Sequence, residues 1–149
     1  MIKSKNIKKK SFIIAADHAG YKLKEEIKKF LLKKGRNVLD IGTKNTESVD
    51  YPDYAHLMSK KIGNDGKKLG ILICGSGIGM NMAANRHKNI RAALCYNIKT
   101  SKLSRMHNNA NVISIGARLT KKNIVFKCID VFEKTKFSGG RHLRRVKKI

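Results

Sequence analysis

Short apolar runs alternate along this chain with stretches in which apolar residues recur every three or four positions. The apolar runs, which predict buried strands, are residues 12–16, 38–41, 69–74, 92–95 and 112–115. Strands that are apolar throughout are typical of a parallel sheet, because helices cover both of its faces. The alternation therefore predicts an α/β fold with three layers, α/β/α, around a five-stranded parallel sheet.

The intervening segments predict amphipathic helices whose ends are marked by glycine. Expected helical faces are Leu23–Leu31 before Gly35, Ala55–Ile62 before Gly63, Met80–Arg86, Thr100–His107 and Ile124–Phe132. A length of 149 residues fits one domain, 1–149. Residues 1–11 form a basic N-terminal extension, and the basic tail 136–149 is expected to be loosely tied.

The order of the strands determines where a ligand would bind. In a doubly wound domain the order is 2-1-3-4-5 or 3-2-1-4-5, and the first is our prediction. Ligands bind at the carboxyl ends of the strands where the order reverses, which here is between the first and third strands. This prediction brings Asp17–Gly20 and Cys74–Gly79 to one place.

The segment Cys74-Gly-Ser-Gly-Ile-Gly79 is the strongest single motif, because it follows an apolar strand and precedes a helix. Glycines permit close backbone approach, and successive N–H groups at a helix start form an anion pocket. The segment lacks the Lys and Ser/Thr of a P-loop, and Met80 replaces the third glycine of a dinucleotide fingerprint. An anion-binding loop and a purely structural turn both remain open from spacing alone.

Cys74 stands at the mouth of this turn. Backbone N–H groups and a helix start favour a thiolate, which can act as a nucleophile or a base. Cys95 and Cys128 instead fit inert buried thiols, since one falls in a strand and the other on the core face of a helix.

Other polar residues have both functional and structural interpretations. Asp17 and His18 follow the first strand, where an Asp is also a preferred helix cap. His107 falls at a helix end, where the macrodipole favours it, and Arg118 follows the fifth strand. Arg141 and Arg145 are four residues apart, so they share a helical face and could grip one anion or simply lie in solvent.

The charge is high but spread out. Lys and Arg number 34 against 10 Asp and Glu, a net charge of +24. Aromatic residues make up only 6% and Trp is absent, so base stacking has little support and nucleic acid is not the expected main partner. No apolar run approaches the roughly 20 residues of a membrane span. Three cysteines in no disulfide or metal spacing favour a cytoplasmic chain.

Taken together, the motifs resemble one family. The segments are Asp17-His-Ala-Gly20, Asp50-Tyr-Pro52, Gly70-Ile-Leu-Ile-Cys-Gly-Ser-Gly-Ile-Gly79, Ala83-Ala-Asn-Arg86, Ser104-Arg-Met-His-Asn-Asn109, Gly116-Ala-Arg118 and Gly139-Gly-Arg-His142. From about Phe12 to Arg145, the chain is similar to the type B ribose-5-phosphate isomerases, which belong with the galactose-6-phosphate isomerase subunits.

The resemblance implies a Rossmann-like homodimer, or a tetramer, that interconverts ribose 5-phosphate and ribulose 5-phosphate in the non-oxidative pentose phosphate pathway. It implies no metal or redox cofactor. In the family, the cysteine matching Cys74 moves a proton between C2 and C1 through a cis-enediolate. The glycine loop holds the developing oxyanion, which places Gly75, Ser76, Gly77, Ile78 and Gly79 around the substrate.

The remaining family roles are spread along the chain. The resemblance assigns sugar-ring opening to His107 with Asp17 nearby, sugar contacts to Tyr51 and Asn108, and phosphate binding to His18, Arg118, Arg141 and Arg145. It implies that two subunits share each site. An isomerase of allose or galactose 6-phosphate is the first alternative, although the segment around His107 favours the five-carbon sugar. A non-catalytic basic protein that binds nucleic acid is the second.

Overall fold

The computed structural model describes residues 10–64 and 66–149. Its strands are β1 (Ser11–Ala16), β2 (Asn37–Asp40), β3 (Lys68–Cys74), β4 (Ala92–Leu94) and β5 (Val112–Gly116). Its helices are α1 (Tyr21–Lys33), α2 (Tyr51–Ile62), α3 (Ile78–Ala84), α4 (Ile98–Asn108), α5 (Lys122–Lys134) and α6 (Arg141–Val146). Most of the expected N-terminal extension, residues 1–9, lies outside the described residues, and Ser11 already belongs to β1.

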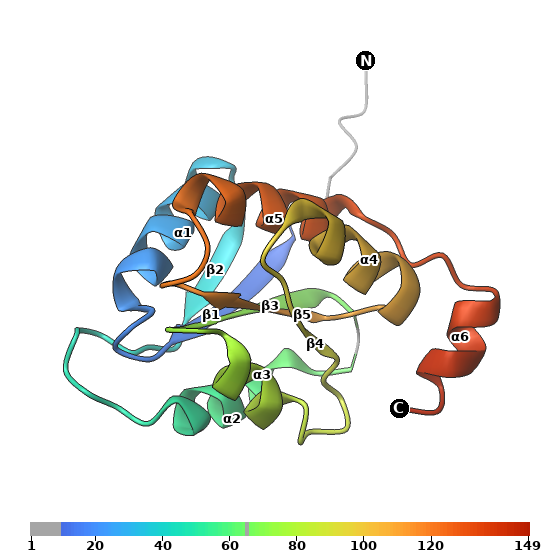
Figure 1. The fold of residues 1–149 in the computed structure, drawn as a ribbon, viewed down its shortest axis with the longest axis horizontal. Coiled ribbons are helices and arrows are strands. Elements are labelled where there is room, and N and C mark those ends of the chain that lie inside the picture. The colour runs from blue at the N-terminus through green and yellow to red at the C-terminus, as the bar shows by residue number, and fades with distance from the viewer. Residues whose placement is uncertain (1–9, 65) are drawn as a thin grey trace, which may run out of the picture.

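All strand pairs are parallel and form one five-stranded sheet. Helices α1, α4 and α5 cover one face, and α2 and α3 cover the other, while α6 lies to the side beyond α4 (Figure 1). This arrangement confirms the predicted three layers. Phe12, Ile14 and Ala16 of β1 pack into one core cluster, whereas Ile13 and Ala15 pack into the second, as alternation along a strand requires.

The predicted strand order is wrong at one end of the sheet. The observed order is β2-β1-β3-β5-β4, so β5 and β4 are exchanged relative to 2-1-3-4-5. The burial of the two strands explains the exchange: β5 is buried along its whole length, whereas β4 has three half-buried residues and suits an edge. Because crossovers are right-handed, stepping back from β4 to β5 also moves α4 to the face of α1 and α5.

The exposed edge of β4 is covered by a side chain. The amide of Asn85 accepts a hydrogen bond from the N–H of Ala92 at 2.8 Å and donates one to the carbonyl oxygen of Ala92 at 2.9 Å. These bonds satisfy backbone groups that a neighbouring strand would otherwise satisfy.

Glycines end two of the helices, and a short exposed helix lies in the C-terminal tail. Helix α1 gives way to Gly35 with φ 70° and α2 to Gly63 with φ 69°, which confirms both glycine stops. The tail beyond Lys136 contains α6, none of whose residues is buried. The N–H of Ser138 donates to the carbonyl oxygen of Met106, which ties the start of the tail to α4.

Within the described residues, no helix has the length and hydropathy of a membrane span.

A buried lysine joins α1 to β2. Lys24 is 1% exposed, and its ammonium lies 2.6 Å from Asp40 and 2.8 Å from Glu25. Although burial opposes ionisation of Asp40, hydrogen bonds from Lys24 and Lys28 keep its pKa below the ordinary value. A buried ammonium needs these carboxylates, because an unpaired charge in the core is strongly unfavourable.

We predict that Asp40→Asn lowers the free energy of unfolding at pH 7 by about 1–3 kcal/mol, because it removes one of the two carboxylates that neutralise buried Lys24. The loss is moderate, because Asp40 is itself partly exposed to solvent. A carboxylate with a lowered pKa stabilises the fold above its unfolded pKa and loses that effect as pH falls through the folded value. The difference in free energy of unfolding between the Asp40→Asn variant and the original chain should therefore narrow below about pH 3.9. Urea unfolding at pH 7 and pH 3 measures both effects.

Glu26→Gln is the matched control, because Glu26 pairs with Lys122 at 3.4 Å with both side chains about half exposed. We expect it to change the stability by less than about 0.5 kcal/mol. Equal effects of the two substitutions would contradict the importance of the buried pair.

Candidate active site

The turn after β3 is held against the end of β5 by close backbone contact. Gly77 has φ 78°, and a Cβ atom there would lie 2.8 Å from the carbonyl carbon of Ile115. A Cβ on Gly116 would lie 2.6 Å from the carbonyl oxygen of Ser76. The hydroxyl of Ser114 donates to the carbonyl oxygen of Gly77 at 2.6 Å. Only glycines allow this approach, so the sequence of the loop determines its place on the sheet.

Cys74 ends β3 directly beneath this turn. Its side chain is 4% exposed, and the N–H of Gly77 donates to its Sγ at 3.1 Å. The other two thiols have different surroundings: burial raises the pKa of Cys95 to about 11 and also raises the pKa of Cys128. Both are free and buried in the core, and their lack of reactivity stays a prediction.

A pocket of about 320 Å³ opens over Cys74 at the carboxyl edge of the sheet. Its lining comes from the turns after β1, β3 and β5 and from the start of α2: Asp17, Tyr51, Cys74, Gly75, Ser76, Gly79, Arg118 and Leu119. The sequence placed this crevice between the first and third strands, and the register of β1 with β3 brings Ala16 beside Ile73 there. The predicted meeting of the two polar segments is confirmed.

Tyr51 forms one wall of the pocket. A Cβ atom on Gly79 would lie 2.6 Å from the Tyr51 ring, so the ring rests on the bare backbone of the glycine loop. Asp17 is buried beside the loop, and its carboxylate accepts a hydrogen bond from the N–H of Gly20 at 3.1 Å. It thus supports the turn into α1 while facing the pocket.

The remaining predicted residues divide into those near this edge and those far from it. His18 is half-buried outside the pocket lining, and its Nδ1 accepts a hydrogen bond from the N–H of Val49 at 3.2 Å. The exposed Arg118 lines the pocket, and its N–H donates to the carbonyl oxygen of Gly75. Ile78 is 45% exposed at the start of α3.

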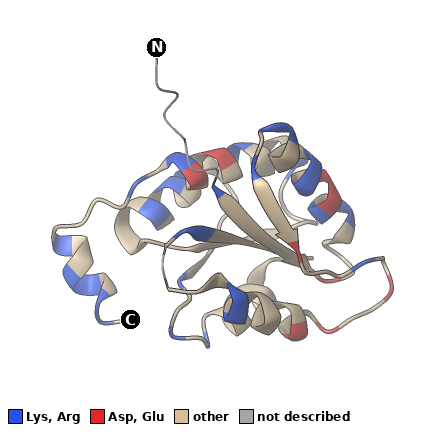
Figure 2. Ribbon diagram, turned by 180° about the vertical axis from the view of Figure 1, so that it is seen from behind, with Lys and Arg blue, Asp and Glu red and all other residues tan. Residues whose placement is uncertain are grey.

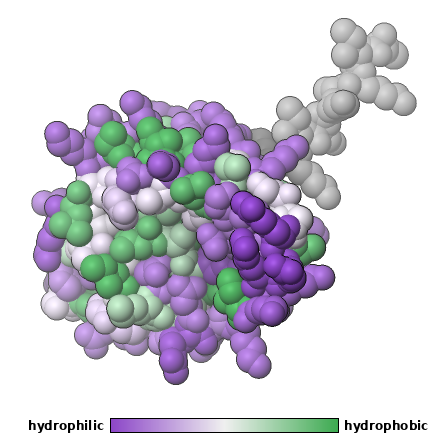
Figure 3. All heavy atoms as spheres, turned by 45° about the vertical axis from the view of Figure 1, so that its right-hand side comes forward, coloured by the Kyte–Doolittle hydropathy of each residue, from purple (hydrophilic) through white to green (hydrophobic). Residues whose placement is uncertain are grey.

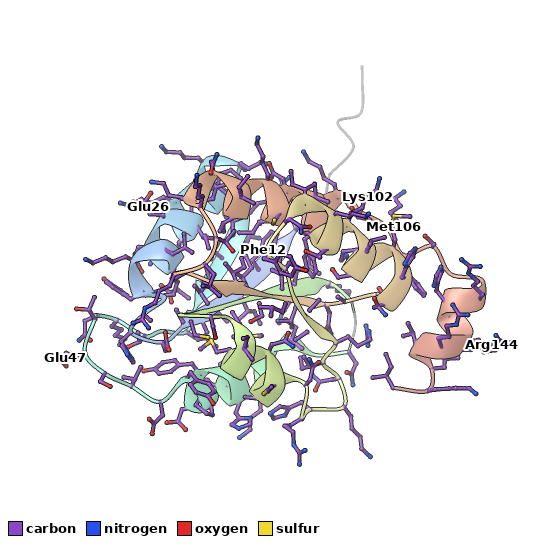
Figure 4. All side chains as sticks on the ribbon, in the orientation of Figure 1. Phe12, Glu26, Glu47, Lys102, Met106 and Arg144 are labelled. Atoms are coloured by element: carbon purple, nitrogen blue, oxygen red, sulfur yellow. The ribbon has the colours of Figure 1, made fainter. Side chains whose placement is uncertain are left out.

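His107, Asn108, Arg141 and Arg145 are not brought to Cys74 within one chain. A helix that follows a parallel strand runs back toward the amino edge, so the end of α4 lies away from the pocket. In Figure 4, Met106 of α4 and Arg144 of α6 lie at the right, whereas Glu47, from the loop after β2, lies at the far left. The distant residues nevertheless form a group of their own.

The rings of His107 and His142 stack in parallel, with centroids 4.2 Å apart. Desolvation lowers the pKa of His142, and the electrostatic influence of His107, Arg141 and Arg145 lowers it further. Figure 3, which brings this side forward, shows a strongly hydrophilic patch over the region of α6. The group thus concentrates cationic and imidazole side chains, which are suited to an anion, on one exposed face.

The sequence analysis missed two residues of the site. Leu119 is 70% exposed and lines the pocket beside Arg118, and no pattern pointed to it. Ser114 holds the glycine turn, and its signal was a single polar residue inside an otherwise apolar strand.

The positive charge follows the predicted distribution. Lys and Arg lie on helices of both layers and on α6 rather than in one stripe (Figure 2). Among the side chains that the structure describes, no three His, Cys, Asp or Glu residues are grouped so that they could hold a metal ion.

Known proteins share the sequence and the fold of this chain. A family model described as Ribose/Galactose Isomerase matches residues 12–149. Ribose-5-phosphate isomerase B of Escherichia coli is 37% identical over 94% of each chain. A ribose 5-phosphate isomerase structure from Thermotoga maritima is 48% identical with a TM-score of 0.90, covering 93% of this chain and 95% of that one.

A second solved structure carries a ligand. The Mycoplasma genitalium ribose-5-phosphate isomerase B, with bound ribulose-5-phosphate, is 44% identical with a TM-score of 0.89 and covers 93% of this chain and 92% of its own. The family model spans the sheet, the pocket and the α4–α6 group alike. On these matches, the chain belongs to the ribose/galactose isomerase family.

Proposed function

We propose that this protein interconverts ribose 5-phosphate and ribulose 5-phosphate, with Cys74 as the base. The observation that carries the proposal is the Cys74 thiol at the end of a central strand, beneath a glycine turn and facing a pocket of about 320 Å³. The Mycoplasma genitalium relative with bound ribulose-5-phosphate supports the choice of substrate.

The chemistry follows from moving one proton between neighbouring carbons. In the conversion of aldose to ketose, the Cys74 thiolate removes the proton from C2 of the open-chain sugar, which leaves a cis-enediolate. The same thiol returns the proton to C1, while the hydroxyl proton passes from O2 to O1. The N–H of Gly77 donates to Sγ and holds the sulfur in position, and the low exposure of Cys74 keeps bulk water from it.

The glycine turn provides for the negative charge of the intermediate. Gly75, Ser76 and Gly79 line the pocket, and we assign their backbone N–H groups to an enediolate oxygen of the substrate. Rigid donors of this kind stabilise a developing oxyanion strongly, since removing one typically costs about 10²–10³ in rate. The Ser76 hydroxyl accepts from the N–H of Ile78 at 3.2 Å, so its own proton is available to the substrate.

Ring opening and phosphate binding require residues that one chain does not bring to its own pocket. We assign these steps to a second copy of the chain, whose His107 and Asn108 would reach the sugar and whose Arg141 and Arg145 would hold the phosphate. Arg118 and His18 of the first chain would complete the phosphate site, and Asp17 would assist ring opening. The separation of the α4–α6 group from Cys74, together with the exposure of α6, supports a shared site in a homodimer.

We predict that Cys74→Ala lowers kcat for ribose 5-phosphate by about 10³-fold or more, because a positioned base typically contributes about 10²–10⁴-fold. The phosphate affinity and the fold should change little, since no proposed phosphate contact is removed. A coupled assay with ribose 5-phosphate measures turnover, and parallel assays with allose 6-phosphate and galactose 6-phosphate test the six-carbon alternative.

The matched control is Cys128→Ala, which removes a core thiol on the other side of the sheet. It should lower stability while leaving kcat per folded molecule within about twofold, because it forms a cavity away from the pocket. Retained turnover in folded Cys74→Ala protein would refute the role of the base.

A shared site predicts complementation between two inactive variants. Cys74→Ala and His107→Asn should each be inactive alone, yet a mixed dimer holds one site with both original residues. Random exchange makes about half of the dimers mixed, so activity should return to about a quarter of that of the original protein. The measurement is turnover after mixing, with native mass spectrometry to confirm exchange.

The control mixture pairs Cys74→Ala with the double variant Cys74→Ala/His107→Asn, which supplies no intact cysteine and should regain no activity. If confirmed mixed dimers of the two single variants stay inactive, both residues do not come together across the dimer as proposed.

A further inference from the structure

A second polar cavity, of about 280 Å³, lies at the amino edge of the sheet, opposite the Cys74 pocket. It borders the start of β3, the approach to β4 and the end of α4. Its lining includes three cations and several asparagines, among them Lys68, Arg91, Arg105, Asn89, Asn109 and Asn111.

Both arginines are held in place by neutral groups. The Nε–H of Arg91 donates to the carbonyl oxygen of Asn109 at 2.8 Å. Arg105 donates from Nε to the carbonyl oxygen of Thr135 at 3.3 Å and from Nη1 to that of Ala110, and it lies 5.3 Å from the centre of the Phe132 ring. Each guanidinium plane is therefore fixed by one edge, which leaves further N–H donors for another partner.

No counter-charge faces these cations among the residues that the structure describes, 10–64 and 66–149. Among residues 10–64 and 66–149, no carboxylate forms an ion pair with Lys68, Arg91 or Arg105. Burial lowers the pKa of both arginines, and the charge of Arg91 lowers that of Arg105 further. Two half-buried like charges side by side are unfavourable, and a bound anion would relieve both costs at once.

The asparagines make the walls rigid. The side chain of Asn111 accepts from the N–H of Arg91 at 2.8 Å and donates to the carbonyl oxygen of Asn89 at 2.7 Å. Asn89 in turn donates to the carbonyl oxygen of Ser59 on α2 at 3.0 Å. The cations thus occupy a cavity that is organised before any ligand arrives, which reduces the entropy lost on binding.

We propose that the cavity lined by Lys68, Arg91 and Arg105 is a second anion site, which binds a phosphate dianion. Forked guanidinium donors match the oxygens of phosphate, and the exposed ammonium of Lys68 adds a charge at the mouth. The ligand is either inorganic phosphate or the phosphate of a small monoester, because the volume admits little more. The inference does not depend on the chemistry proposed for Cys74.

Nuclear magnetic resonance distinguishes the two sites within the whole chain. Inorganic phosphate, titrated at constant ionic strength, should shift the backbone amide signals of Arg91 and Asn111 in a saturable way. Ribose 5-phosphate forms the second arm: shifts with both ligands identify phosphate itself, and shifts only with the sugar identify a monoester. Either result supports the site, whereas unshifted signals with both ligands overturn it.

The variants test which side chains are responsible. Lys68→Gln and Arg91→Gln should each weaken phosphate binding at these signals about tenfold, as expected for the loss of one charged hydrogen bond. Lys102→Gln removes the same charge from the exposed surface of α4 and should leave binding within about twofold.

Lys68 keeps the test decisive if Arg91→Gln fails to fold, because Lys68 is exposed at the first position of β3. Equal weakening by Lys68→Gln and Lys102→Gln would overturn the proposal, since that result reports only general attraction to a basic protein. Equal shifts from acetate at the same ionic strength would overturn it for the same reason.

Discussion

The contact between two bare backbones, at Gly77 and Gly116, is the constraint on which the rest of the structure depends. It lets the turn after β3 lie against the end of β5, and the Ser114 hydroxyl fastens the two together. The same contact fixes the N–H of Gly77 on the Cys74 sulfur and leaves residues of the turn in the lining of the pocket. A methyl group at either glycine would separate the strand ends, so strand packing and the chemistry of the site share one steric requirement.

The local sequence pattern predicts most of this fold, but it does not predict which strands lie next to each other at one end of the sheet. Apolar runs and glycine stops predict every strand and the ends of α1 and α2, because burial and left-handed backbone are recorded in the residues themselves. The residues of β4 and β5 do not themselves determine the exchange of the two strands, since either order buries apolar strands. The brevity of Ala92–Leu94 is the one local sign that this strand suits an edge.

The candidate site divides along the same line. Cys74 and the glycine turn could be recognised from a strand followed by a helix, because parallel strands present their carboxyl ends together. The roles proposed for His107 and Arg141 could not be inferred from spacing, since the helix that carries His107 runs back toward the other edge of the sheet. Only the family resemblance joins them to the cysteine, through a second copy. Buried Lys24 was missed for a related reason: helical periodicity places a lysine on a polar face without showing that β2 supplies acids there.

The many positive side chains of this chain gather into a defined group only in particular places. On the helices the positive charge is dispersed, whereas at the amino edge Arg91 and Arg105 lie together without a described acidic partner.

The hydrogen bonds between Asn85 and β4 have a consequence for the edge of the sheet. Because Asn85 occupies both outward backbone groups of Ala92, the β4 edge cannot readily recruit a strand from another molecule. Two copies of the protein should therefore not pair edge to edge through β4, and at this edge the protein resists the strand-on-strand growth of fibres.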